Sequence, residues 1–220
     1  MVLMLLMLLQ LNLLMENSIT LYGASGHGKV IIDILNAVGV KIKSVIDDNP
    51  KSESILGIPV AKTSEYDMSS LGETIISIGN NKVRKKLSIS LSANFAKAVH
   101  PSAVISPNSS IGEGTVVMAR VAINPDVTIG KHCIINTNAT VEHDALIADF
   151  VHICPGVSLA GDVTIGEGTQ VGIGAAVIQG ISIGKWVTIG AGAVILNDIP
   201  DYAVVVGNPG KIIKYNSINE

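Results

Sequence analysis

The stretch Val141–Asp144 reads VEHD and places an imidazole, His143, between the carboxylates of Glu142 and Asp144. Histidine is the side chain whose ordinary pKa lets it accept and release a proton near neutral pH. The residues around this stretch are mostly small or aliphatic and offer little other chemistry. His143 is therefore the first candidate for a general base, and its use depends on how the chain positions it.

A hexapeptide repeat surrounds this stretch. Every sixth residue from Val99 to Ile195 is aliphatic without a break in phase, and the residue four positions later is small or β-branched. A period of six fits neither an amphipathic helix nor a single alternating strand. It predicts an all-β parallel β-helix, in which three short faces form one coil of 18 residues. Roughly five and a half coils, stacked about 4.8 Å apart, form a prism about 26 Å long.

The corners of this prism follow from the same repeat. Gly, Asn and Asp cluster just after the aliphatic position, as in IGEG, INPD and LAGD. These residues tolerate the positive φ that a tight corner demands. His143 lies two residues after the inward Val141, so we expect it to project outward from a corner, where only a neighbouring chain could shield it.

The segment before the repeat has a different pattern. SITLYGASGHGKVIIDILNAVG predicts a strand, a Gly-rich turn and a helix, KIKSVIDD a second strand, and ETIISIGNNKVRKKLSISL a third strand and a helix. This alternation predicts a small parallel α/β (Rossmann-like) sheet with its ligand at the carboxyl ends of the strands. Gly23, Gly26 and Gly28 approximate a phosphate-binding loop, and Asp47 and Asp48 lie where such folds often bind a ribose. The short domain favours a nucleotide-linked ligand over NAD.

Composition and the chain ends set further limits. A net charge of −3 without a Lys/Arg-rich block gives no reason to expect nucleic acid or an anionic membrane as partner. Cys133 and Cys154 form no CxxC motif, which predicts reduced thiols in a cytoplasmic protein.

The apolar residues 1–14 are too short for a comfortable membrane span and lack a signal-peptide pattern. We expect residues 1–17 to be an extension outside the fold, with a membrane-surface anchor as the alternative. The predicted domains are 18–97, 98–200 and a tail, 201–220.

Segments of both domains resemble one family. GASGHGK, IDD, IGNNKVR, INTNATVEHDALIADFVHICPGVSLAGDVTIG, VGIGAAV and VVGNPGK, which span residues 18–213, resemble the sialic acid O-acetyltransferase-like family of bacterial sugar acyltransferases. Within it, they are most similar to N-acetyltransferases of UDP-4-amino-4,6-dideoxy sugars. The resemblance implies a left-handed β-helix, a homotrimer with active sites between prisms, and acetyl transfer from acetyl-CoA to the amino group of a nucleotide-linked sugar.

The resemblance also implies roles for individual residues. His143 is the general base, Asp144 orients its imidazole, and Glu142 has a weaker role. No metal is expected. The residues expected near the nucleotide-sugar are Gly23, Ser25, Gly26, His27, Gly28, Asp47, Asp48 and Asn80. The residues expected near acetyl-CoA are His152, Gly161, Gly172, Ile173, Gly174, Asn208 and Pro209, with the tail closing on the coenzyme.

Three alternatives remain open from the sequence. The same chemistry could acetylate a hydroxyl of sialic acid or of another sugar. The prism could be a non-catalytic scaffold or ligand sensor. A zinc-dependent β-helix carbonic anhydrase would need three converging His, but His132, His143 and His152 occupy different phases of the coil, which disfavours it.

Overall fold

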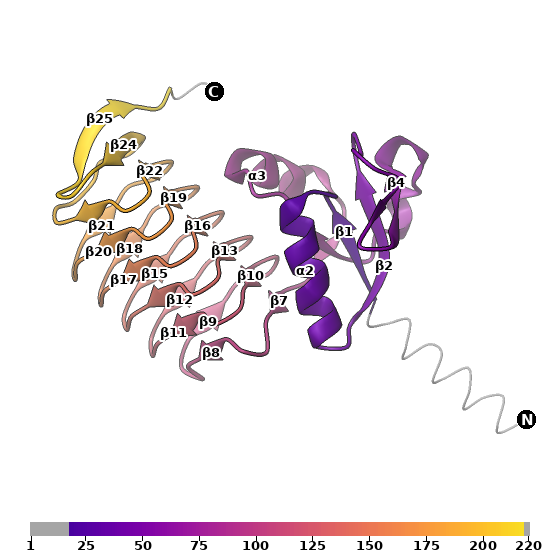
Figure 1. Cartoon of the computed structure of the whole chain (residues 1–220), viewed down its shortest axis with the longest axis horizontal. Coiled ribbons are helices and arrows are strands. Elements are labelled where there is room, and N and C mark those ends of the chain that lie inside the picture. Colours follow the sequence, from indigo (N-terminus) through magenta and orange to yellow (C-terminus); the bar gives the residue numbers. More distant parts are fainter. Residues whose placement is uncertain (1–17, 218–220) are drawn as a thin grey trace, which may run out of the picture.

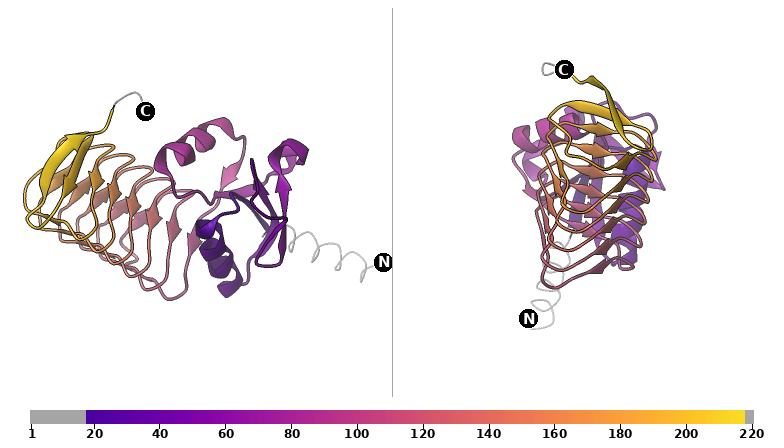
Figure 2. Two further views of the ribbon diagram at one scale, coloured as in Figure 1. Left: turned by 45° about the horizontal axis from the view of Figure 1, so that its top comes forward. Right: turned by 90° about the vertical axis from the view of Figure 1, so that its left-hand side faces the viewer.

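The computed structural model describes residues 18–217, and the predicted extension at residues 1–17 lies outside that range. A small α/β domain is followed by a long parallel β-helix, so the predicted fold class is confirmed (Figure 1). Figure 2 shows the α/β domain beside the first coils of the prism, with the chain ending at the opposite end of the prism.

The α/β domain has one sheet of strand order β3-β4-β2-β1-β5-β6, parallel except for the β3–β4 hairpin. Its elements are β1 (Ser18–Tyr22), α2 (Gly26–Ala37), β2 (Lys41–Asp47), β3 (Ser54–Ile55), β4 (Ile58–Lys62), the 3-10 turns Thr63–Glu65 and Met68–Ser70, β5 (Glu73–Ile76), α3 (Asn81–Ser90) and β6 (Asn94–Phe95). Because α2 follows β1 and α3 follows β5, and these strands are parallel neighbours, both helices begin at the same sheet edge.

The prism consists of two-residue strands, one every six residues. They are β7 (Ala98–Val99), β8 (Val104–Ile105), β9 (Ser110–Ile111), β10 (Val116–Val117), β11 (Ala122–Ile123), β12 (Thr128–Ile129), β13 (Ile134–Ile135), β14 (Thr140–Val141), β15 (Leu146–Ile147), β16 (His152–Ile153), β17 (Ser158–Leu159), β18 (Thr164–Ile165), β19 (Gln170–Val171), β20 (Ala176–Val177), β21 (Ser182–Ile183), β22 (Thr188–Ile189) and β23 (Val194–Ile195). Paired residues such as Val116 and Ile134 are 18 positions apart, which confirms the predicted coil length.

The strands form three faces. Face 1 contains β7, β10, β13, β16, β19 and β22, face 2 runs from β8 to β23, and face 3 runs from β9 to β21. β24 (Ala203–Val206) extends face 1 in parallel, and β25 (Lys211–Tyr215) pairs with it antiparallel. The corners are named by the faces that they join: residues 142–144 lie in the 2–3 corner, 148–150 in the 3–1 corner and 154–156 in the 1–2 corner.

The corners from Gly114 to Gly192 use the same backbone conformation. The third residue after each inward aliphatic from Ile111 to Ile189 has a φ between +52° and +71°. The series is Gly114, Arg120, Asp126, His132, Asn138, Asp144, Phe150, Gly156, Asp162, Gly168, Gly174, Gly180, Trp186 and Gly192. Gly, Asn and Asp visit this left-handed region at low cost, whereas bulky residues rarely do. His132, Phe150 and Trp186 share the 3–1 corner, which is the corner that α3 contacts.

The inward side chains form one continuous core. Val141, Val151, Ile153 and their equivalents in other coils are fully buried. The first coil is the exception, where Val99 and Ile105 are only partly buried because no coil lies below them. On the outside of face 1, Val116 and Ile134 belong to the apolar cluster of the α/β domain. The α/β domain therefore packs on face 1.

A buried guanidinium makes hydrogen bonds that join the two domains. Arg84 of α3 is 1% exposed. Its Nε donates to the carbonyl of His132 at 2.7 Å, and its Nη2 donates to the carbonyl of Phe150 at 3.0 Å. Its other donors bind the carbonyls of Ile78 and Gly79 and the side chain of Asn81. All of these acceptors are neutral, so the hydrogen bonds alone compensate for the loss of water around the cation.

We predict that Arg84→Met destabilises the protein by about 3 kcal/mol or more, because several buried carbonyls lose their donor. Lys86→Met on the exposed side of the same helix is the matched control and should change stability by less than about 0.5 kcal/mol. Denaturant unfolding of both variants measures the difference. Equal stabilities would contradict the role given to Arg84.

Candidate active site

His143 projects from the 2–3 corner. Val141 points inward and is fully buried, and two residues later the His143 side chain is 61% exposed. Asp144 occupies the left-handed corner position, with φ at +62°. This turn brings its carboxylate back toward the ring, where Asp144 Oδ2 accepts a hydrogen bond from His143 Nδ1 at 2.7 Å. Nε2 is then the nitrogen that is free to accept a proton.

Nearby carboxylates make this imidazole more basic. The pKa of His143 is raised, first by the hydrogen bond to Asp144 and also by the charges of Asp144, Glu142 and Asp162. Glu142 does not contact the ring through a hydrogen bond; its Oε2 accepts from Asn124 Nδ2 at 2.6 Å in the preceding coil. The structure thus gives Asp144 a direct contact and Glu142 an electrostatic one.

Gly161 lies against the imidazole in the next coil, at the position equivalent to His143. A Cβ on Gly161 would come within 2.7 Å of His143 Cε1 and 2.8 Å of Nε2. The sequence predicted Gly161 beside the coenzyme; its contact with the ring gives it a second reason to be glycine. The signal was present in the 18-residue spacing, but nothing in the sequence shows which way the ring points.

We predict that Gly161→Ala lowers turnover by about tenfold to a hundredfold, because the ring must turn away from its position against the glycine. In a His143→Ala background the same change should have no further effect on rate, since no ring remains to be displaced. A double-mutant cycle on turnover and on unfolding measures this coupling. Additive losses would show that Gly161 acts independently of His143.

A second group of polar residues lies where the α/β domain meets face 1. Asn136 Nδ2 donates to His152 Nε2 at 3.1 Å, and His152 also hydrogen-bonds the Gly79 backbone. Burial and the nearby Arg84 charge lower the pKa of His152 to about 4. His152 is therefore neutral near pH 7 with both ring nitrogens engaged, which makes it a poorer base than His143.

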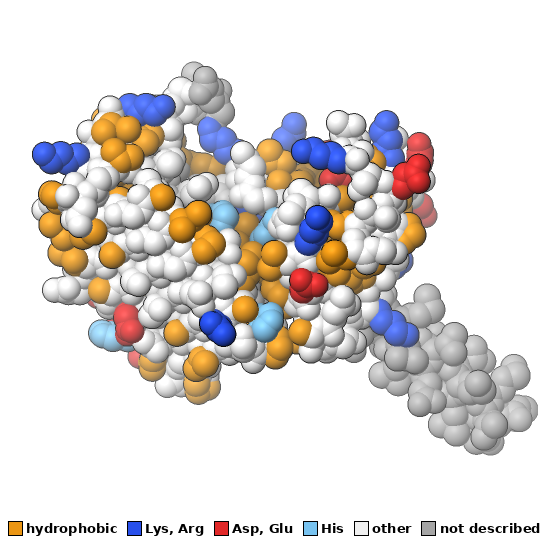
Figure 3. Space-filling view, viewed as in Figure 1, with side chains coloured by type: hydrophobic (Ala, Val, Ile, Leu, Met, Phe, Trp, Pro, Cys, Tyr) orange, Lys and Arg blue, Asp and Glu red, His pale blue; other side chains and the backbone are white. Residues whose placement is uncertain are grey.

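His27 lies in the same seam. Burial, then the neighbouring His152 and Arg84, lower its pKa to about 3. Its Nε2 is buried and has no hydrogen-bond partner within residues 18–217. Figure 3 shows a hollow along this seam, with histidine side chains visible in it. A buried nitrogen without a partner is expected to meet a ligand or an ordered water.

The glycines of the β1–α2 turn and of the first turn of α2 have different structural roles. A Cβ on Gly23 would lie 2.8 Å from Ile78, and one on Gly28 would lie 2.9 Å from the Gly23 carbonyl. Gly26 faces open space. Ser25 precedes the helix without a side-chain cap, so backbone N–H groups at the start of α2 keep the capacity to bind an anion.

The predicted acids shape this loop. Asp47 Oδ2 accepts from the Ala24 N–H at 2.7 Å. Asp48 Oδ1 accepts from Tyr22 Oη at 2.6 Å and from Thr63 Oγ1 at 2.7 Å. Burial, with help from Asp48, raises the pKa of Tyr22, so the phenol keeps its proton. Both carboxylates therefore hold the ends of β1 and β2 in place, besides any ribose contact.

Asn80 also has a structural partner, because its side chain caps α3 by accepting from the Val83 N–H at 3.0 Å.

A hollow of about 340 Å³ opens beside this loop. Ser25, Gly26, Lys29 and Lys51 are among the residues that line it. The two lysines add positive charge to the uncapped start of α2, a combination that suits a phosphate group. Our sequence reading missed both. Lys29 ends the GASGHGK motif and could have been found, whereas Lys51 lies in a loop without any motif.

The remaining coenzyme candidates lie on the 1–2 corner and at its end. Gly156, Gly174 and Gly192 occupy equivalent corner positions with positive φ and open space around them. Next to them, Ile173 is 60% exposed. A Cβ on Gly172 would come within 2.5 Å of the Ile189 carbonyl, so close stacking of the coils requires that glycine.

Asn208 and Pro209 lie in the turn between β24 and β25. The neighbouring Gly210 N–H donates to the Val194 carbonyl at 2.8 Å, which places this turn beside β23, the last strand of face 2.

Neither thiol is activated as a nucleophile. Burial raises the pKa of Cys133 to about 12 and that of Cys154 to about 11.

Within residues 18–217, there is no group of three or more His, Cys, Asp and Glu side chains that could bind a metal ion. No helix in that range is long and apolar enough to cross a membrane.

The two groups of candidate residues lie on different sides of the prism. His143 is on the 2–3 corner. The α/β domain, with the seam that contains His27 and His152, covers face 1. In a triangular prism, the corner between two faces is opposite the third face. Within one chain, therefore, the proton-accepting group and the nucleotide-type site point in opposite directions.

Comparison with protein families and known proteins gives consistent matches. Residues 18–91 match the model of the PglD N-terminal domain, and residues 108–143 and 162–197 match the bacterial transferase hexapeptide (six repeats). A UDP-N-acetylbacillosamine N-acetyltransferase of Bacillus subtilis is 42% identical over 111 residues, which are 46% of this chain. That match spans about half, 51%, of the relative's length.

Solved structures match over nearly the whole fold. Perosamine N-acetyltransferase of Caulobacter crescentus, as a histidine-to-asparagine variant in complex with CoA and GDP-perosamine, has a TM-score of 0.86 and 37% identity, with 90% of this chain and 97% of that chain covered. The acetyltransferase domain of PglB from Neisseria gonorrhoeae, in complex with acetyl coenzyme A, has a TM-score of 0.82 and 36% identity, with 90% and 99% covered.

Proposed function

Because the chain belongs to the PglD-like family of hexapeptide-repeat sugar acetyltransferases, we propose that it transfers the acetyl group of acetyl-CoA to the amino group of a nucleotide-linked amino sugar. The observation that carries this proposal is the exposed His143, whose Nδ1 is held by Asp144 and whose Nε2 is free. The complexes of the Caulobacter relative with CoA and GDP-perosamine support the choice of substrates.

In the proposed reaction, His143 Nε2 accepts a proton from the acceptor amine as the amine attacks the thioester carbonyl. A C–N bond forms, the C–S bond breaks, and the thiolate of coenzyme A leaves with a proton returned by the imidazolium. Asp144 stabilises the imidazolium through Nδ1. The neutral, buried thiols of Cys133 and Cys154 favour direct transfer over an acyl-enzyme.

The glycine-lined 1–2 corner suits the pantetheine arm of acetyl-CoA. Gly156, Gly174 and Gly192 leave backbone groups accessible along three successive coils, and Ile173 supplies apolar surface. The β24–β25 turn, with Asn208 and Pro209, lies at the end of this path and could contact the nucleotide end of the coenzyme. On this proposal, residues 201–217 close over acetyl-CoA.

The hollow at the start of α2 suits the diphosphate of the acceptor. Lys29 and Lys51 supply charge, and the backbone N–H groups near Ser25 and Gly26 supply donors. From there the sugar would extend along the seam toward the His27 Nε2 that lacks a partner. We also propose that the protein acts in the cytoplasm.

We propose a homotrimer, and the positions of the two sites support an assembly of more than one chain. Since His143 is opposite the face that carries its own α/β domain, an acceptor bound in that domain must meet His143 of another chain. On this proposal, each active site combines the 2–3 corner of one prism with the seam and 1–2 corner of a neighbouring prism, and a monomer has no complete site.

We predict that His143→Ala lowers turnover by about 10² to 10⁴ while leaving acetyl-CoA binding nearly intact. The wild-type rate should fall as the pH drops through the raised pKa of His143, because the protonated ring cannot accept a proton. Asp144→Asn should move this acidic limb to lower pH, since the main cause of the shift is removed. Coenzyme A release across UDP-, GDP- and CMP-linked amino sugars measures both effects.

Near-normal turnover in His143→Ala would place the base elsewhere. An acetylated product cleaved by hydroxylamine would indicate an ester, and hence O-acetylation in place of the proposed amide.

A further inference from the structure

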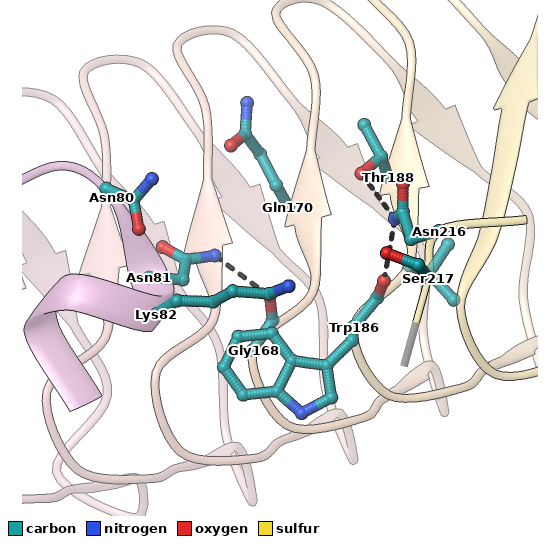
Figure 4. A pocket seen from close by; sticks show the side chains of 10 residues that line it. Asn80, Asn81, Lys82, Gly168, Gln170, Trp186, Thr188, Asn216 and Ser217 are labelled. Carbon is teal, nitrogen blue, oxygen red and sulfur yellow. Dashed lines mark hydrogen bonds between the residues drawn. The ribbon is translucent and has the colours of Figure 1, made fainter. Parts of the chain in front are cut away.

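A second hollow, of about 310 Å³, lies between the start of α3 and the upper coils of face 1 (Figure 4). Asn80 and Lys82 line it from α3, Gln170, Trp186 and Thr188 from the prism, and Asn216 from the segment after β25. It lies on the opposite side of the prism from His143 and beside the 3–1 corner. The reaction proposed above uses none of its prism residues.

The outward residues of face 1 change character where the hollow begins. Val116 and Ile134 are apolar and buried under the α/β domain. In the coils above, the same outward position holds His152, Gln170 and Thr188. His152 lies in the seam with the α/β domain, next to Gly79, and in the two coils above it Gln170 and Thr188 form the prism wall of the hollow.

Trp186 gives the hollow a fixed aromatic surface. It is the chain's only tryptophan and occupies a left-handed corner position, with φ at +55°. Its ring lies over Gly168, where a Cβ would come within 2.5 Å of ring carbons. Lys85 Nζ lies 5.5 Å from the ring centroid. The glycine beneath and the cation beside it hold the indole in one orientation.

The polar side chains around the indole retain free hydrogen-bonding groups. Asn216 Nδ2 donates to the Trp186 carbonyl at 3.1 Å and to Thr188 Oγ1 at 3.3 Å, which leaves its Oδ1 as an acceptor. Asn80 uses its Oδ1 to cap α3 and keeps its Nδ2 donors. Figure 4 shows no hydrogen bond between the Gln170 amide and the other residues of the lining. Lys82 is the one charged residue of the lining, which contains no carboxylate.

We propose that this hollow binds a pyranose sugar, separately from acetyl transfer. Each hydroxyl of a pyranose both donates and accepts, which matches the amides of Asn80, Gln170 and Asn216. The C–H face of the ring is apolar and can pack on the indole of Trp186. A single lysine is too little charge for a polyphosphate. The sugar could be a free glycan unit or the sugar of a nucleotide-sugar, which present the same ring.

The single tryptophan makes the hollow directly observable. Indole fluorescence of the full chain, excited selectively, is titrated with N-acetylglucosamine, with UDP-N-acetylglucosamine and with UDP. We expect a saturable change with the first two ligands and none with UDP. Gln170→Ala should weaken the sugar response by about threefold to tenfold, the usual effect of losing a neutral hydrogen bond. Thr164→Ala, an exposed outward position on face 3, is the matched control and should respond like wild type.

A further control separates this hollow from the proposed acceptor site. Gly26→Leu adds a side chain in open space beside α2 and fills the other hollow. The response to N-acetylglucosamine should persist in this variant. Four results would overturn the proposal: no saturable change with either sugar, an equal change with UDP alone, a response that Gln170→Ala leaves intact, or a response that Gly26→Leu abolishes.

Discussion

The left-handed corner that recurs every sixth residue is the constraint on which the rest of the structure depends. Three such corners close a coil of 18 residues, so each side chain lies above its equivalent in the coil before. Residues at equivalent positions in adjacent coils therefore contact one another and determine how their side chains are oriented. Gly161, in the coil above, contacts the His143 ring, and Gly168, in the coil below, contacts the Trp186 ring. A glycine in one coil thus fixes an aromatic or imidazole ring in another.

The same corners explain how the two domains join. On the 3–1 corner, α3 binds a row of backbone carbonyls of corner residues. Arg84 contacts the carbonyls of His132 and Phe150, and Asn81 donates to that of Gly168 at 3.0 Å. Lys85 adds an ion pair with Glu167. These contacts fix the orientation of the α/β domain on face 1. The positive charge of Arg84 also helps to keep His152 neutral.

The sequence predicted the parts that depend on periodicity. The six-residue pattern gave the inward positions, the coil length and the outward direction of His143, because each follows from counting along one chain. The contacts of Arg84 could not be predicted in this way, since its acceptors are backbone carbonyls that carry no sequence signal. Lys51 was missed for a similar reason, because a loop brings it beside α2. The opposite positions of His143 and the α/β domain required the three faces to be placed in space.

That opposition leads to the central claim, which is that two chains build each active site. It can be tested by mixing two variants that are inactive for different reasons. His143→Ala lacks the base, and Gly26→Leu fills the acceptor hollow next to α2. If each site takes its base from one chain and its acceptor domain from another, co-assembled mixed oligomers should regain measurable coenzyme A release, while each variant alone stays inactive. Mixed oligomers that form but show no activity above that of the separate variants would contradict the account.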